Sequence, residues 1–316
     1  MARVSVGRSQ EDGEVASQNA EPPGDEIHRT LTGWLAEDEG IQFLLGRAPT
    51  PEEDLTGLRE RLANRRQAVA SREPFREVDA VVAPADPASL EAIAARPDLQ
   101  AAFSNLTWQV AMVDLGAVLS AQKAVRLAGI EERVSGVGND LEALLALCLP
   151  SEQPSSPARA FADVDGKGVT MSSSNPNLRL AGMQVVQPAG GAGSAGQQGQ
   201  QDGLTAQQEG LMVVVQLKTS YLQVAHYQGR YFLVDGYHRA AGLLRSGITV
   251  VPSILFDADS FEQVLPTAGL FSYETVFGER PPRLVDFWDA TVSDDVSRPS
   301  VRKVIRVRGD EFVVEG

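Results

Sequence analysis

The residues best suited to chemistry form one short segment, DGYHR at positions 235–239. An apolar run, Tyr231 to Val234, precedes this segment, and an alanine- and leucine-rich stretch follows it as far as Gly247. This order predicts a strand, a tight turn and a helix, with a second strand after the glycine. The start of such a helix directs unpaired backbone N–H groups and the positive end of the helix dipole toward an anion.

Two residues of the segment strengthen the prediction of an anion site. Gly236 lets a ligand approach the backbone closely, because it has no side chain. Arg239, in the first turn of the helix, offers a planar fork of donors that fits phosphate or carboxylate. The alternative is an ordinary turn, in which Tyr237 packs against the core while His238 and Arg239 lie on a solvated face.

The same segment resembles a known family. DGYHR after an apolar strand, followed by AAGLLRSGI and a second strand, is similar to the ParB/sulfiredoxin-like superfamily, in which a G-x-x-R or DG-x-HR turn grips nucleotide phosphates. The match spans Val213 to Phe256, and residues 108–126 would supply the opening strand and helix of the superfamily. The matching positions of the turn are Asp235, Gly236, His238, Arg239 and Ala240.

Three activities of this superfamily can be compared with the residues. Sulfiredoxin chemistry needs a cysteine in the turn, where this chain has Tyr237. Partition-type ParB proteins bind CTP through a longer arginine-rich box, of which only Gly236, Arg239 and Ala240 are present. The free-serine kinases carry a DG-H-HR turn, which this chain matches better than the other two patterns.

The resemblance to these kinases implies a bound nucleotide, ATP, ADP or CTP, together with Mg²⁺. His238 and Arg239 would clamp the phosphates, Gly236 and Tyr237 would border the nucleotide, and Asp235 would face the metal ion or cap the helix. Asp235, His238 and Arg239 are therefore the candidate catalytic residues. A general base is not identified, because spacing singles out none of the carboxylates after the next strand, which are Asp257, Asp259 and Glu262.

The sequence thus predicts a protein that binds a small-molecule nucleotide or phosphate, and the activities open to it are phosphotransfer and nucleotide hydrolysis. One alternative is a non-catalytic interaction or regulatory protein that retains the fold, which the amount of chain outside the motif favours. A second alternative is a ParB-like nuclease or DNA-associated protein. The formal net charge of −14 argues against it, because nonspecific affinity for nucleic acid comes mainly from lysine and arginine.

The amino-acid composition excludes several classes of protein. The chain has 316 residues and a hydrophobic content of 43%, which is enough for one large core or two modest ones. Neither a stretch long enough to span a membrane nor a secretory signal at the start is recognisable. The single cysteine, Cys148, excludes disulfides and cysteine-rich zinc sites within one chain. We therefore expect a soluble, cytoplasmic protein without membrane contact.

The expected fold class is α/β, of the α+β type, with a small mixed sheet in a ParB/sulfiredoxin-like core. Residues 1–26 are polar and acidic and are predicted to be disordered. Residues 27–105 form a predicted N-terminal helical region. The predicted ParB/sulfiredoxin-like domain covers residues 106–270 and contains a flexible, glycine- and glutamine-rich insertion at 187–210. Residues 271–316 are a C-terminal extension with a predicted β-hairpin.

Local patterns predict the elements in more detail. Apolar spacing predicts a helix from Ile27 to Gly46, and the sequence TPEE, which starts at Thr50, predicts the start of the next helix. Asp86-Pro87 likewise predicts a helix start, with Asp86 as the N-cap and Pro87 at the first helical position. Residues 108–113 have strand character, and residues 183–186 and 212–217 are predicted to pair as a hairpin. Pro252 predicts an edge or a bulge in the strand after the helix, and Arg302, Arg306 and Arg308 share one face of the C-terminal hairpin.

Overall fold

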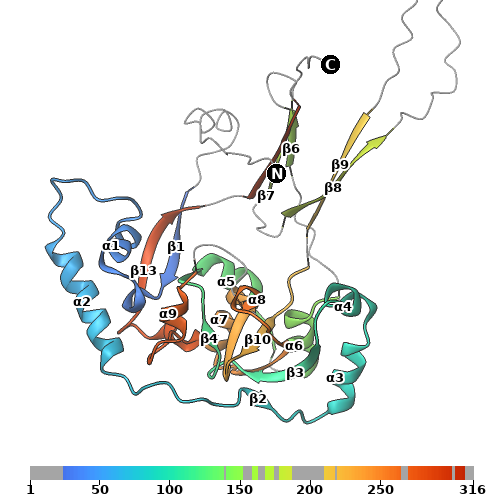
Figure 1. The fold of residues 1–316 in the computed structure, drawn as a ribbon, viewed down its shortest axis with the longest axis horizontal. Coiled ribbons are helices and arrows are strands. Elements are labelled where there is room, and N and C mark those ends of the chain that lie inside the picture. The colour runs from blue at the N-terminus through green and yellow to red at the C-terminus, as the bar shows by residue number, and fades with distance from the viewer. Residues whose placement is uncertain are drawn as a thin grey trace, which may run out of the picture. The chain divides into compact units, whose positions relative to one another are not determined.

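A computed structural model describes residues 24–138, 140–151, 159–162, 168–173, 178–186, 210–217, 219–264, 270–300 and 303–309 (Figure 1). The chain divides into two compact units. Unit 1 comprises residues 1–151 and 220–300, and unit 2 comprises residues 152–219 and 301–316. The region predicted as N-terminal helices and most of the predicted ParB/sulfiredoxin-like domain thus share one unit.

Unit 1 is built around a six-stranded mixed sheet with the strand order β2-β3-β12-β10-β11-β4. Strands β10 and β12 pair in parallel, as do β11 and β4, whereas the other neighbours are antiparallel. This sheet and the helices of unit 1 confirm the α+β class and the strands predicted at 108–113 and 231–234. The bounds are β2 Val81–Val82, β3 Trp108–Asp114, β4 Leu119–Ser120, β10 Gln223–Tyr227, β11 Arg230–Asp235 and β12 Val250–Asp257.

Helix α7 connects β11 to β12 and carries the DGYHR segment at its start. It spans Tyr237–Arg245, and Gly247 follows with a φ of +78°, which agrees with the predicted end of the helix. Its residues Ala240, Ala241 and Leu243 are fully buried in the main core, which also contains Phe232 of β11. The small side chains of α7 let it pack closely against helix α5, Leu127–Val134.

A second, three-stranded antiparallel sheet of unit 1 has the order β13-β1-β5, with β1 Asp25–Thr30, β5 Ala124–Arg126 and β13 Asp294–Pro299. The helix predicted from Ile27 is therefore wrong in its first part. Strand β1 is followed by a 3-10 turn, η3 Thr32–Trp34, and only then by helix α1, Glu37–Leu45. The strand forms because distant segments of the chain pair with it, and a local apolar pattern does not contain that information.

Helix α2, Thr56–Ala70, begins later than the sequence predicts. The Thr50 backbone N–H does donate to Glu53 Oε2 at 2.9 Å, but this contact closes a separate turn before the helix. Asp86, in contrast, accepts from the Ser89 backbone N–H and caps α3 as predicted. The remaining helices of unit 1 are α3 Pro87–Ala94, α4 Pro97–Ala102, α6 Leu141–Cys148, α8 Phe261–Val264, α9 Tyr273–Val276 and the 3-10 helix η4 Leu284–Trp288.

Unit 2 contains strands only among its described residues. One sheet has the order β14-β7-β6, and β8 pairs with β9 as the hairpin predicted for 183–186 and 212–217. The first arm of the predicted C-terminal hairpin is a strand, β14, but it pairs with β7; the residues after 309 lie outside the described ones, as do 1–23 and 187–209. The bounds are β6 Arg159–Ala162, β7 Gly168–Ser173, β8 Leu178–Val186, β9 Gly210–Leu217 and β14 Lys303–Arg308.

The close contact between α5 and α7 depends on Gly242. A β-carbon at this position would lie 3.0 Å from Ile130 Cγ2 and closer still to Val134 Cγ2. We expect Gly242→Ala to lower the free energy of unfolding by about 1–3 kcal/mol through overpacking. The matched control is Gly57→Ala in α2, where a β-carbon meets nothing within 4 Å. This variant should be slightly more stable than wild type, by about 0.5–1 kcal/mol. Urea denaturation measures the free energy of unfolding of the two variants. Equal changes in Gly242→Ala and Gly57→Ala would contradict the packing of α5 against α7.

Candidate functional site

The turn before α7 has the backbone geometry that the sequence predicts. Gly236 has a φ of +95° and lies immediately before the helix. Its N–H donates to Asp235 Oδ1 at 2.7 Å, and its carbonyl accepts from the Ala240 N–H at 2.9 Å. A β-carbon here would be only 3.2 Å from Leu222 Cα. Glycine is thus required both by the left-handed backbone and by the neighbouring chain.

The Arg239 side chain is bound inside the protein. Only 6% of the residue is exposed, and its guanidinium donates to the carbonyls of Leu147 at 3.0 Å and Ser220 at 2.8 Å, and to Ser220 Oγ at 2.7 Å. The donors predicted to clamp phosphate are therefore bound to main-chain carbonyls and to the Ser220 hydroxyl. Arg239 binds these oxygens because it lies on the side of α7 that faces the end of α6. The local sequence does not indicate that α6 is a neighbour.

Asp235 and Tyr237 also contribute to internal contacts. Asp235 Oδ2 accepts from Ser220 Oγ at 2.9 Å, so Ser220 links this carboxylate to Arg239. The buried Tyr237 hydroxyl donates to the Leu233 carbonyl at 2.6 Å and accepts from the Ala121 N–H at 3.1 Å, and burial raises its pKa. These contacts hold the turn in place, and they leave the predicted catalytic and nucleotide-binding roles of the two residues without geometric support.

His238, unlike Arg239, is directed toward β5 and α5. Its Nε2 accepts from the Arg126 backbone N–H at 3.2 Å, which places the proton of the neutral ring on Nδ1. A β-carbon on Gly129 would lie 2.9 Å from His238 Cδ2 and 3.2 Å from Arg126 Nε. The imidazole and the Arg126 side chain thus converge over Gly129, where the helix surface has no side chain.

Several positive groups surround His238, and we call His28, Arg126, Arg133 and His238 the cation cluster. The pKa of His238 is lowered to about 3, first by burial and then by the positive charges of Arg133 and Arg126 and by His28. Burial and the charge of Arg298 likewise lower the pKa of His28.

The Glu26 carboxylate balances part of this charge. Glu26 Oε1 accepts from Arg126 Nη1 at 3.0 Å, and Glu26 Oε2 lies 4.0 Å from His28 Nε2. On a chain whose net charge is −14, the cluster places the guanidinium groups of Arg126 and Arg133 near His238, where their charges add to the effect of burial in lowering its pKa. The Arg126 and His28 side chains remain 22% and 18% exposed, so the cluster is accessible to a ligand.

Sequence reasoning found His238 but missed the other three members of the cation cluster. Arg126 lies at the end of the segment predicted to open the ParB/sulfiredoxin-like domain, yet only the packing of α5 against α7 brings it to His238. His28 belongs to β1, which pairs with β5 at Arg126. The carboxylate Asp257 is not brought to the turn, because it lies beside His226 at the other end of β11.

The internal bonds of Arg239 predict that this residue stabilises the fold. Arg239→Ala leaves buried carbonyls without donors, so we expect the free energy of unfolding to fall by about 3 kcal/mol. Arg245→Ala on the same helix is the control, because that side chain is 52% exposed and its ion pair with Glu131 is 3.8 Å long. Exposed pairs contribute about 1 kcal/mol or less. Chemical denaturation followed by intrinsic fluorescence gives the free energy of unfolding of the two variants. Similar decreases in Arg239→Ala and Arg245→Ala would argue against a stabilising role of the buried Arg239 side chain.

The lowered pKa of His238 predicts an acid-sensitive fold. Because the folded-state pKa, about 3, lies below the unfolded value of 6.5, the unfolded chain takes up a proton first between these two pH values. The free energy of unfolding should therefore decrease as pH falls through this window, by at most about 1.4 kcal/mol per pH unit for one group. His238→Gln keeps an acceptor for Arg126 and removes this contribution. Denaturation at several pH values should give a shallower slope for the variant; identical slopes would refute the assignment.

Comparisons of the chain with protein-family models, with curated proteins and with solved structures gave no match. Within the described residues, none of the helices combines the length and the apolar character that crossing a membrane requires. The same residues contain no group of three or more His, Cys, Asp and Glu side chains that could hold a metal ion. The ParB/sulfiredoxin-like core, the nucleotide and Mg²⁺ remain predictions from the sequence.

Proposed function

We propose that unit 1 binds a phosphate-bearing small molecule at the cation cluster beside the start of α7. The observation that carries the proposal is the convergence of the His238 imidazole and the Arg126 side chain over Gly129. The Arg133 guanidinium and the titratable His28 imidazole also lie close enough to lower the pKa of His238. Concentrated positive charge at a partly exposed position favours an anion.

The chemistry of the cluster favours phosphate over a carboxylate. Guanidinium groups match the tetrahedral oxygens of phosphate with several donors at once, and two histidines can add charge by taking up protons when the anion arrives. Helix α7 adds the positive end of its dipole, since it has nine residues and starts at Tyr237. ATP, ADP and CTP, with or without Mg²⁺, are the ligands that follow from the sequence resemblance.

This proposal changes the role of the DGYHR segment. His238 contacts the ligand, whereas Asp235, Tyr237 and Arg239 hold the turn through their bonds to Ser220, Leu233 and Leu147. Gly236 allows the turn to form. Phosphotransfer or nucleotide hydrolysis would also need a general base. Asp257 lies at the other end of β11, and Glu26, the carboxylate beside the cluster, is bound to Arg126.

A second candidate is a non-catalytic interaction or regulatory protein that retains the fold. A specific observation favours it: the donors of Arg239 are directed to the carbonyls of Leu147 and Ser220, so the motif has a structural use without any ligand. The two candidates differ in one measurable property, since only the first requires an anion to bind.

Thermal unfolding with ligands tests the proposal. At constant ionic strength, pyrophosphate, ATP, ADP or CTP should raise the Tm, because a ligand at 100 times its Kd stabilises the folded state by about 2.7 kcal/mol. Arg126→Gln removes a guanidinium but keeps the backbone N–H that binds His238, and we expect the ligand to bind about tenfold more weakly. Arg76→Gln, an exposed arginine before β2, is the control and should bind as wild type does.

The outcomes separate the two candidates. No Tm shift of wild type with any of these ligands would favour the interaction protein. A shift of wild type that Arg126→Gln leaves unchanged would place the anion elsewhere and contradict the cation cluster as its site. Repeating the titration with and without Mg²⁺ determines whether the metal ion contributes to binding.

A further inference from the structure

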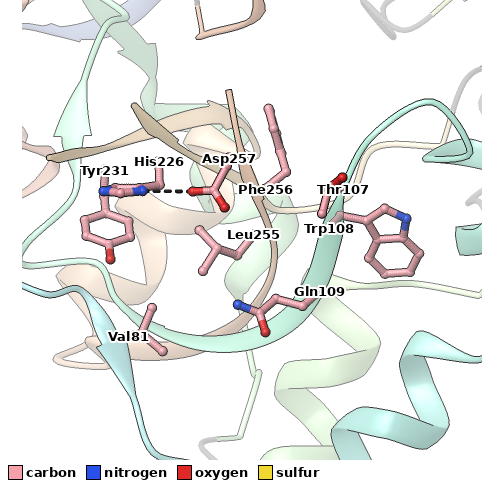
Figure 2. A pocket seen from close by; sticks show the side chains of 9 residues that line it. All are labelled: Val81, Thr107, Trp108, Gln109, His226, Tyr231, Leu255, Phe256 and Asp257. Carbon is pink, nitrogen blue, oxygen red and sulfur yellow. Dashed lines mark hydrogen bonds and ion pairs between the residues drawn. The ribbon is translucent and has the colours of Figure 1, made fainter. Parts of the chain in front are cut away.

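Unit 1 contains a second polar site at the opposite end of β11 from the DGYHR turn. A cavity of about 300 Å³ opens there between the ends of neighbouring strands (Figure 2). This volume is at the lower end of the range for small-molecule sites. Among its lining residues are Val81 of β2, Gln109 of β3, His226 of β10, Tyr231 of β11, and Leu255 and Asp257 of β12.

The polar groups of the cavity contact one another and a neighbouring carboxylate. His226 Nδ1 lies 2.9 Å from Asp257 Oδ1, on the parallel neighbouring strand. The imidazole packs against the Tyr231 ring at a centroid distance of 4.7 Å, with the two ring planes tilted by 31°, and the Tyr231 hydroxyl donates to Asp79 Oδ1 at 3.0 Å. Figure 2 shows His226 between the phenol ring and the Asp257 carboxylate. Burial, followed by the contact with Asp79, raises the pKa of Tyr231 to about 12, so this ring stays neutral.

The charge of this cavity is opposite to that of the cation cluster. The described residues that line it include the Asp257 carboxylate but no lysine or arginine, and a second carboxylate, Asp79, accepts from Tyr231 at its border. The rest of the lining combines apolar side chains, such as Leu255 and Val81, with the rings of Tyr231 and His226. Such a lining attracts a positive group and repels an anion.

We propose that this cavity binds a small organic cation, an ammonium group on an apolar or aromatic stem. The ammonium group donates to the Asp257 carboxylate, whose second oxygen remains an acceptor beside the His226 contact. The apolar or aromatic stem lies against Leu255 and Val81. This site is independent of the proposed phosphate site, because it uses other residues and needs the opposite charge.

An NMR titration with three probes of nearly the same shape tests the proposal. Phenethylamine carries the ammonium group, 2-phenylethanol is its neutral counterpart, and phenylacetate is an anionic one. We expect phenethylamine to bind up to about fivefold more tightly than the alcohol, because only the ammonium group can form an ion pair with the exposed Asp257 carboxylate. Phenylacetate should bind most weakly. The signals that shift should be those of the His226 and Tyr231 rings, which line the cavity.

Variants of neighbouring carboxylates separate this site from general attraction to an acidic protein. Asp257→Asn should reduce phenethylamine binding about fivefold and leave the alcohol unaffected, and its 81% exposed side chain makes a folding defect easy to exclude by thermal melting. Asp259→Asn removes an exposed carboxylate two residues away and should have no effect. Equal affinity for the three probes, absence of phenethylamine binding, or equal losses in the two variants would overturn the proposal.

Discussion

The buried guanidinium of Arg239 is the interaction on which the geometry of unit 1 depends most. It donates to the Leu147 carbonyl at the end of α6 and to the Ser220 carbonyl before β10. The Ser220 hydroxyl in turn donates to the Asp235 carboxylate at the end of β11. Burial lowers the pKa of Arg239, and the nearby Asp235 opposes this effect. A buried charge is tolerated only when its donors are used, so these bonds fix the start of α7 relative to three other segments.

This constraint explains why adjacent residues of one motif have different roles. Consecutive positions on a helix point about 100° apart, because a turn contains 3.6 residues. Arg239 therefore faces the core, while His238 faces α5 and meets Arg126 over Gly129. The buried side of the turn holds the fold, and the partly exposed side gathers positive charge. The function that we propose belongs to the second side.

Local sequence patterns predicted those parts of the fold that local physics determines. The strand, turn and helix around Gly236 follow from apolar runs and a glycine, and the cap at Asp86 follows from its own neighbours. Strand β1 was missed because its pairing partners lie far away in the sequence. Pro252 was expected at an edge or a bulge. It lies in an internal strand, but pairing with β10 begins only at Ile254, so β3 alone pairs with the strand at Pro252.

The site was predicted less completely than the fold, for the same reason. A sequence motif identifies residue types but not the direction of each side chain, and the direction of Arg239 depends on the end of α6, some 90 residues earlier in the chain. The cation cluster draws on β1, β5, α5 and α7, which meet only in the folded protein. The cavity beside His226 likewise combines residues from five strands of one sheet.

The pKa of His238, measured by NMR with and without saturating pyrophosphate, tests the central claim most directly. The chain has three histidines, and His226 at the other end of β11 serves as an internal reference. The account predicts a His238 pKa far below 6.5 in the free protein and a clear rise when the anion binds, with His226 unchanged. A His238 pKa near 6.5 in the free protein, or one that pyrophosphate does not move, would contradict it.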